Sequence, residues 1–388
     1  MTKTDELLRK EFENLIESYK ITDSSNEEEI KSFLDKISNW LIENIPKKLY
    51  RYRNCSDYNI MSLENDEIWG SSLLNLNDSF EGIPSFDLEK INQDIKELFS
   101  KEGIKKYVEN IYQFGYPDRY EKMFSPSLKE NFNKNLEENL KNKELMIEKL
   151  YDFLNNIKNN FIINLNNNLS KLILEIYKNV DIYRSYRKIA CFSTTYNSTL
   201  MWGHYADGHK GFVVEYDMNE IIEKCTMNCN KESLKNCNKL GLNYLLAPVM
   251  YREKSYDGTD YLIQEIMYNI LSSIFTSEEI KYFNNDTLFY LKLILNKSKE
   301  WEYEKEWRLI ANFQLETEQL TPECILKCKP KKVFLGAKMD KINREKIIEI
   351  CNGKNIEYEE MQINYLSNDY SIETKSYFEK NNKPLIEI

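Results

Sequence analysis

The sequence predicts an α+β protein in which a mixed or antiparallel β core carries N-terminal helices and a long helical insertion. Two observations support this fold class. Apolar residues recur at intervals of three and four, as on one face of a helix, within residues 1–46 and 85–180. Within residues 47–84 and 181–388, short runs rich in aromatic and β-branched residues are separated by turns. We therefore expect an N-terminal helical segment at 1–46, a core assembled from 47–84 and 181–388, and a helical insertion at 85–180.

The first helices are expected over residues 4–45 and end at Pro46, because proline cannot continue a helix. The segment KLYRYR follows and favours a strand through Leu49, Tyr50 and Tyr52. The other expected elements are helices over Ser56–Asn65, Tyr261–Phe275, Thr287–Asn296 and Asp340–Cys351 (ending before Gly353), and strands over Glu67–Ser71, Ile189–Thr195, Gly211–Asp217, Leu245–Arg252, Trp301–Phe313, Lys332–Gly336 and Ile356–Ile363.

The helical insertion is poor in glycine and rich in Lys, Glu and Asn. Its apolar stripe predicts a long amphipathic helix or an antiparallel hairpin. Such a stripe either packs on the core as a helical layer, or it binds a partner or a second copy of the chain. The stripe comprises Leu136, Leu140, Ile147, Leu150, Leu154, Ile157, Phe161, Leu165, Leu169, Leu172, Ile176 and Val180.

Composition limits the function classes. The 388 residues include 53 Lys and Arg against 63 Asp and Glu, a net charge of −10. This balance disfavours a long contact with duplex nucleic acid, which needs many unopposed cations. The acidic, amphipathic start of the chain is unlike a secretory signal, and no apolar run approaches the ~18 residues of a membrane span. We therefore expect a cytoplasmic protein with no membrane contact and with reduced cysteines.

The segment MWGHYADGHKGF contains both histidines of the chain, His204 and His209. Histidine suits proton transfer near neutral pH and metal ligation. Alternatively, Trp202, His204 and Tyr205 fix a turn between strands, with glycines supplying unusual backbone angles. The spacing is not by itself a strong zinc motif.

The segment EWEYEKEWRLI places several acids close together. In a strand, Glu302, Glu304, Glu306 and Arg308 share one face, with neighbouring carboxylates ~7 Å apart. Like charges this close raise one another's pKa, which is typical of functional sites. The alternative is the solvated face of an edge strand, made acidic for solubility.

Two further strands carry polar groups. CFSTT places Ser193 and Thr195 on the same face as Cys191, where hydroxyls suit sugar or amide groups or bond to their own backbone. LYRYR places Arg51 and Arg53 on one face, as paired guanidinium groups that suit phosphate or carboxylate recognition. Alternatively, the tyrosines of this strand pack inward and both arginines are exposed.

The cysteines offer a weaker possibility. Cys225, Cys229 and Cys237, and separately Cys324 and Cys328, include C-x3-C pairs that fall within the range of zinc spacings. Ordinary buried or surface thiols are the simpler interpretation. We therefore assign no metal ligand.

Four segments carry a family resemblance: LYRYR, WGSSLLNLNDSFEG, ACFSTTYNSTLMWGHYADGHKGFVVEYD, and KEWEYEKEWRLI followed by VFLGAKM. They resemble a bacterial family catalogued as domain of unknown function 2971, in the family's order over Leu49–Glu81 and Ala190–Lys338. Residues 85–180 are a long insertion relative to the compact family pattern. The family is defined without an activity, so the resemblance implies none.

The order of arginine, Ser-Thr-Thr and Glu-Lys-Glu is also similar to that of ADP-ribosyltransferases. This resemblance implies a split-sheet fold and NAD as the substrate. Arg51 or Arg53 would then steady the NAD phosphates, and Ser193 would contact the nicotinamide-side ribose. Glu306 would bind the ribose 2′-hydroxyl and stabilise an oxocarbenium-like transition state, and Glu304 would orient or deprotonate the acceptor. Thr195 stands where that pattern has a serine, and the scheme does not explain the histidines.

Three functions follow, in this order. The first is an NAD-consuming ADP-ribosyltransferase or NAD glycohydrolase with an unknown protein or nucleic-acid acceptor, acting in bacterial stress or phage defence. The second is a metal-dependent hydrolase of a nucleotide or phosphodiester that uses the histidines with Glu304 and Glu306. The third is a non-catalytic binding or regulatory module that acts through the insertion. The candidate catalytic residues are Glu306, Glu304, His204 and His209, and the candidate cofactor-binding residues are Arg51, Arg53, Ser193, Thr194, Trp202 and Tyr205.

Overall fold

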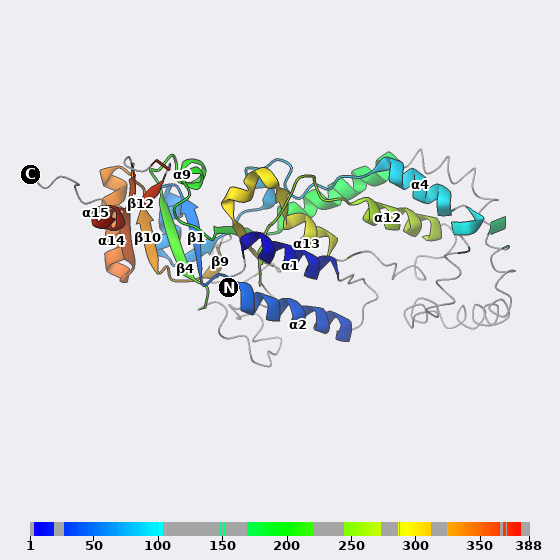
Figure 1. Ribbon diagram of the computed structural model, residues 1–388, viewed down its shortest axis with the longest axis horizontal. Helices are drawn as coiled ribbons and strands as arrows, with labels where there is room; N and C mark the ends of the chain where they lie inside the picture. Colours follow the sequence, from blue (N-terminus) through cyan, green and yellow to red (C-terminus); the bar gives the residue numbers. More distant parts are fainter. Residues whose placement is uncertain are drawn as a thin grey trace, which may run out of the picture.

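The computed structural model describes residues 4–18, 27–98, 100–103, 105, 148, 151–152, 169–219, 244–272, 286, 288–311, 324–364, 368–369 and 371–381. The molecule is elongated, with a sheet near one end and a helical arm that extends from it (Figure 1). No helix within the described ranges is both long and apolar enough to cross a bilayer.

An eight-stranded mixed sheet forms the core of the fold, as expected for an α+β protein. Its order is β12-β11-β10-β4-β1-β3-β8-β5, with only β10 and β11 parallel. The strands are β1 (Lys48–Arg53), β3 (Ile189–Ser193), β4 (Phe212–Asp217), β5 (Tyr244–Pro248), β8 (Glu306–Ala311), β10 (Lys332–Leu335), β11 (Glu357–Ile363) and β12 (Ile372–Thr374). Two small sheets pair β2 (Glu67–Trp69) with β9 (Cys324–Lys327), and β6 (Met250–Arg252) with β7 (Asn296–Ser298).

The sheet is divided between β1 and β3. Strand β1 pairs with β4 along its whole length but with β3 only where Tyr50 lies opposite Ser193. Beyond that pair, β3 is bridged at Ile189 by Ser71, which follows β2. The segment after β2 therefore lies beside β3 where β1 does not, and a space can open between the two strands.

The faces of the central strands follow from their register. Directly opposed residues of an antiparallel pair point to the same side, so Ser193 shares a face with Tyr50 and with Glu306. Arg51 points to the other face, where its guanidinium lies 5.3 Å from the ring centre of Phe192. The arginines of β1 and the acid of β8 therefore start on opposite faces of the sheet.

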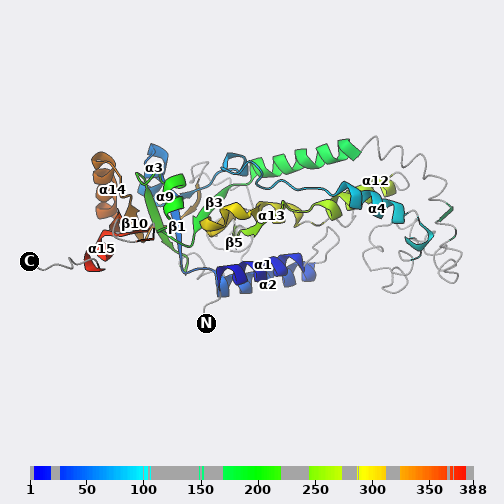
Figure 2. The same ribbon diagram turned by 45° about the horizontal axis from the view of Figure 1, so that its top comes forward.

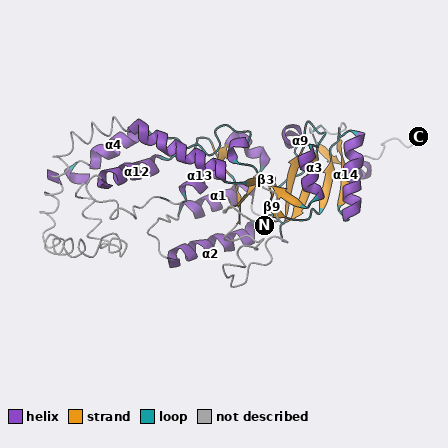
Figure 3. Cartoon of the chain, turned by 180° about the vertical axis from the view of Figure 1, so that it is seen from behind, coloured by secondary structure: helices purple, strands orange, loops and turns teal. Residues whose placement is uncertain are grey.

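Helices cover both faces of this sheet (Figure 3). On the face of the tyrosines, α9 (Thr199–Tyr205) packs Met201 and Trp202 against Tyr50 and Tyr52. On the other face, the main core includes Leu49 together with Ile347 of α14 (Lys341–Lys354). The helix α3 (Asp57–Glu64) contributes to the same core, and α15 (Lys375–Asn381) follows β12.

The N-terminal helices form as expected. Helix α1 (Asp5–Glu17) begins at Thr4, whose hydroxyl accepts a hydrogen bond from the backbone of Leu7, with acids in the first turn to oppose the helix dipole. Helix α2 (Glu27–Asn44) lies beside α1 (Figure 2), and Phe12 packs on Trp40 with ring centres 4.8 Å apart.

The helical arm has its own apolar core. Part of the expected insertion, namely α4 (Leu88–Leu98) and the helix at residues 169–186, packs against α12 (Thr259–Ser272) and α13 (Phe289–Ile294). Ile176 and Val180 of the apolar stripe are buried there. The described end of the stripe thus forms a helical layer, and residues 136–165 of the stripe lie almost entirely outside the described ranges.

Three expected elements were wrong. Trp301–Phe313 is not one strand, because residues 299–304 form the 3-10 helix η2 (Lys299–Glu304) and Lys305 is left-handed with φ 46° before β8 begins. Leu245–Arg252 divides at Val249 into strands of two different sheets. Helix α14 continues past Gly353, because Asn355, with φ 50°, takes the left-handed position after the helix.

Candidate functional site

A cavity of about 320 Å³ lies where β1 and β3 separate. Its walls come from β1, from the segment that runs from β2 past the short 3-10 helix η1 (Leu73–Asn75), from β3, from α9, and from the β7–η2–β8 connection. Predicted site residues line it from several elements: Arg51, Arg53, Ser193, Tyr205, Glu304 and Glu306. The cavity therefore reaches the arginines on one face of the sheet and the acids on the other.

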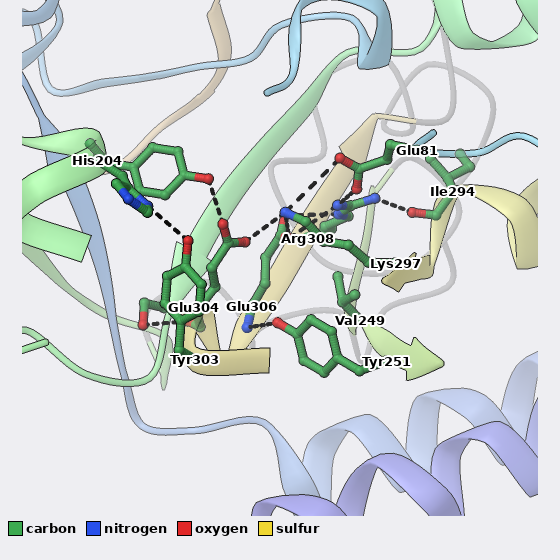
Figure 4. Close-up of polar contacts among 12 residues, drawn as sticks. Glu81, His204, Val249, Tyr251, Ile294, Lys297, Tyr303, Glu304, Glu306 and Arg308 are labelled. Atoms are coloured by element: carbon green, nitrogen blue, oxygen red, sulfur yellow. Dashed lines mark hydrogen bonds and ion pairs between the residues drawn. The ribbon is translucent and has the colours of Figure 1, made fainter. Parts of the chain in front are cut away.

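At the acidic end, Lys297 lies between two carboxylates (Figure 4). Its ammonium is 2.6 Å from Oε2 of Glu304 and 3.1 Å from Oε2 of Glu306. All three side chains are buried. The left-handed turn at Lys305 brings the two acids onto one cation, where an extended strand would have held them ~7 Å apart.

Arg308 and Glu81 extend this network into the core. Arg308 is wholly buried and donates to Glu306 from Nε at 2.8 Å and from Nη2 at 3.0 Å. It also pairs with Glu81 and donates to the carbonyl of Ile294. Burial lowers the pKa of Arg308 to about 9, which still leaves the guanidinium charged at neutral pH. We name the residues Glu81, Lys297, Glu304, Glu306 and Arg308 the ionic cluster.

The carboxyl group of Glu304 is tuned by its surroundings. Burial, then the charge of Glu306, raise its pKa from 4.5 to about 7, while Lys297 and Tyr205 act in the opposite direction. Burial would lower the pKa of Lys297, but the charges of Glu306 and Glu304 outweigh it, so this ammonium stays protonated. Glu304 can therefore gain or lose a proton near neutral pH, whereas Lys297 is unsuited to act as a nucleophile.

Two uncharged groups adjoin the acids. Tyr205 donates a short hydrogen bond to Oε1 of Glu304, and burial raises the pKa of its phenol. Burial, then Glu306, raise the pKa of the Cys191 thiol well above its ordinary value. The thiol is therefore protonated at neutral pH and is not an activated nucleophile.

Ser193 fixes the position of Glu304. Its hydroxyl donates to the backbone carbonyl of Glu304 at 2.7 Å and accepts from the backbone of Thr195 at 3.2 Å. Strand β3 ends at Ser193, so Thr194 and Thr195 lie beyond it, against our expectation, and neither is among the residues that line the cavity.

The arginines of β1 form the basic end of the cavity. Arg51 is only 6% exposed, and its Nη2 donates to the carbonyl of Trp69 at 2.7 Å. Its buried Nε has no hydrogen-bond partner. Arg53 is less buried and lines the same space. A buried guanidinium with a donor to spare suits an anion such as a phosphate or carboxylate.

The histidines do not join the ionic cluster. His204 is exposed at the end of α9 and its Nδ1 lies 2.8 Å from the hydroxyl of Tyr303. His209 has φ 73° and stacks on Trp202 with ring centres 6.2 Å apart. Burial, then Lys338, lower its pKa, which favours the neutral ring. Neither histidine lines the cavity.

Trp202 is a core residue. It is fully buried, packs edge-on against Tyr52, and donates from Nε1 to the carbonyl of Tyr196. The segment around it forms the helix α9 and is not a simple turn between strands. Trp202 and the two histidines therefore shape this region without lining the cavity.

Sequence reasoning missed Lys297 and Glu81. Glu81 belongs to the segment NDSFEG, which contributes to the family resemblance, so that segment held a usable signal. Lys297 lies in no motif, since it reaches the site only through the pairing of β7 with β6. Within the described ranges, no group of three or more His, Cys, Asp or Glu side chains is arranged to hold a metal ion. Cys225, Cys229 and Cys237 lie outside these ranges, Cys324 begins β9, and Cys328 is buried.

A family model described as a protein of unknown function (DUF2971) matches residues 201–309. The match begins within α9 and includes four residues of the ionic cluster, but it does not extend to β1, β2 or Glu81. No curated protein sequence and no solved structure matches the chain, so neither supports a likeness to ADP-ribosyltransferases. The chain is thus similar to DUF2971 over residues 201–309.

Proposed function

We propose that the protein cleaves the bond between nicotinamide and ribose in NAD, and transfers ADP-ribose to an acceptor or to water. The single observation that carries this proposal is the cavity between β1 and β3. One continuous space is lined both by Arg51 and Arg53 and by Glu304 and Glu306. NAD matches this separation of charge, because its diphosphate is anionic and the nicotinamide, one ribose away, is cationic.

The division of the sheet supports the proposal. The strands β1 and β3 share one pair of opposed residues, Tyr50 and Ser193, and the cavity lies where they separate. We take this as the split sheet that a resemblance to ADP-ribosyltransferases implies. The dinucleotide would pass between the strands, with its phosphates at Arg51 and its nicotinamide-side ribose near Glu306.

The ionic cluster suits the reaction chemically. As the bond between ribose C1′ and the nicotinamide nitrogen breaks, its electron pair leaves with nicotinamide and neutralises the pyridinium charge. Positive charge develops at C1′, where a buried carboxylate that cannot reorient stabilises it. Glu306 meets this condition, because Arg308 and Lys297 hold both of its oxygens in place.

Glu304 is placed to handle the acceptor proton. When the acceptor oxygen or nitrogen bonds to C1′, it loses a proton, which the Glu304 carboxylate accepts. A pKa of about 7 lets this group work in both protonation states near neutral pH. Tyr205 and Lys297 keep the carboxylate aimed, each through a hydrogen bond.

The experiment is incubation of the purified protein with NAD labelled on the adenylate, with and without cell extract. Nicotinamide release and transfer of label are followed. Glu306→Gln is expected to abolish release. The matched control is Glu302→Gln, an exposed acid on η2 outside the cavity, which should leave release unchanged. Equal rates in both variants, or no release by the unaltered protein under any condition, would reject the proposal.

A further inference from the structure

The N-terminal helix α1 reaches the candidate site through one buried cation. Arg9 is a charged residue of α1, yet its side chain is buried and only 5% exposed. Its Nη1 donates to the carbonyl of Glu306 at 2.9 Å and to the carbonyl of Val249 at 2.6 Å. Asp5, one turn earlier, accepts from Nε at 2.7 Å and orients the guanidinium.

The backbone of Glu306 is held from both sides. Its N–H donates to the hydroxyl of Tyr251 at 2.8 Å, while its carbonyl accepts from Arg9 and from the backbone of Val249 at 3.0 Å. Arg9 also lies over the ring of Tyr251, 5.0 Å from the ring centre. Arg9 and Tyr251 are therefore joined to each other as well as to Glu306.

The bonds from Arg9 and Tyr251 act where β8 begins. Glu306 is the first residue of β8 and directly follows the left-handed Lys305. At the end of a strand, next to a turn, the backbone has few ladder bonds to fix it. The bonds from Arg9 and Tyr251 replace that restraint and set where the carboxylate of Glu306 meets Lys297 and Arg308.

We infer that Arg9 is a positioning residue for Glu306, and that α1 is thereby a working part of the site. The expected loss of turnover rests on the proposed function. The role of Arg9 in fixing the position of Glu306 does not. Losing the donor would let the start of β8 shift, and a small misplacement of a reacting group lowers turnover steeply. Substrate binding at the distant arginines would be affected much less.

The chain offers a matched control on the same helix. Arg252 also fastens α1 to the core, through Glu13 at 2.5 Å and Glu17 at 3.1 Å, and it is not among the residues that line the cavity. Arg252→Met therefore loosens α1 without touching Glu306. Arg9→Met removes the donor with little change of bulk, and Arg9→Lys restores a cation with three N–H donors at nearly the same length.

The test uses two measurements on the full chain. The first is kcat and KM for nicotinamide release from NAD. The second is the titration midpoint of Glu304, followed by NMR of the glutamate carboxyl carbons and assigned with Glu304→Gln. Arg9→Met is expected to lower kcat by about tenfold or more with little change in KM. It should also displace the Glu304 midpoint, whereas Arg9→Lys and Arg252→Met should stay near the unaltered protein.

The outcomes separate this inference from the proposed function. If the unaltered protein releases no nicotinamide but Arg9→Met alone displaces the Glu304 midpoint, the proposed function fails and the positioning role stands. If Arg9→Met and Arg252→Met act equally, or if Arg9→Met changes nothing, the positioning role is overturned. Should Arg9→Met not fold, Arg9→Gln provides the same comparison, because its uncharged amide ends two bonds short of the Nη1 position that bonds the carbonyl of Glu306.

Discussion

The ammonium of Lys297 lies 2.6 Å from the carboxylate of Glu304, with both side chains buried in the core. The same ammonium contacts Glu306, whose other partner is Arg308. The two acids therefore remain close together because one shared cation offsets their repulsion.

Replacing Lys297 with methionine should destabilise the fold. Removing one partner of a buried ion pair typically costs about 3–5 kcal/mol, because an uncompensated charge is left behind. Urea unfolding measures the free energy of unfolding. The control is Lys299→Met, whose exposed pair with Glu253 should be worth little. A loss for Lys297→Met no larger than that for Lys299→Met would contradict the role of the shared cation.

Glu304 should make the fold less stable as pH rises. Its folded pKa of about 7 lies above the ordinary 4.5, so the folded protein binds the extra proton between these values. The stabilisation from this proton is complete below pH 4.5 and is lost as pH rises towards 7, with a total of up to about 3 kcal/mol. Comparing the free energy of unfolding of the protein and of Glu304→Gln across this range isolates the effect. Parallel pH profiles would show that Glu304 does not titrate as expected.

Glu81→Gln should weaken the cavity wall. Glu81 ties the segment after η1 to Arg308 on β8, and loss of its charge leaves that guanidinium with Glu306 as its main partner. We expect a loss of about 1.5–3 kcal/mol in the free energy of unfolding, as for a hydrogen bond to a charged group. Combining Glu81→Gln with Arg308→Met should cost less than the sum of the single changes. Additive costs would mean that the two residues are not coupled.

Arg51→Met should weaken the binding of a diphosphate ligand. Arg51 lines the cavity and its buried Nε has no partner, so loss of the guanidinium is expected to weaken ADP-ribose binding about tenfold, a loss of about 1.4 kcal/mol. Calorimetric titration measures this change. Arg344→Met is the control, because its pair with Glu360 lies away from the cavity. Equal affinities for the two variants would remove Arg51 from the ligand site.

The two acids of the candidate site could be predicted from the sequence, but their arrangement in space could not. Glu304 and Glu306 were identified because closely spaced carboxylates raise one another's pKa, which is typical of functional sites. Their expected places on one strand face were wrong, since the left-handed conformation of Lys305 is a property of a single backbone angle. Side chains alternate between two faces only in an unbroken strand, so the sequence pattern could not show that the two acids converge on one cation.

Contacts between residues far apart in the sequence could not be predicted from local sequence patterns. Glu81 and Arg308 are 227 residues apart, and Arg9 lies 297 residues from Glu306. Periodicity and capping describe neighbours along the chain, and they placed α1, α2, β1 and β4 well. Contacts such as that of Arg9 depend on how finished elements pack, and a charged residue on an amphipathic helix is ordinarily expected to face solvent.

A crystal structure of the unaltered protein with a carbocyclic NAD analogue, whose nicotinamide bond cannot be cleaved by this route, tests the proposed NAD site most directly. We expect the diphosphate at Arg51 and Arg53, and the nicotinamide-side ring beside Glu306, with the molecule passing between β1 and β3. A cavity that stays empty at saturating analogue, or an analogue bound elsewhere on the protein, would contradict this expectation.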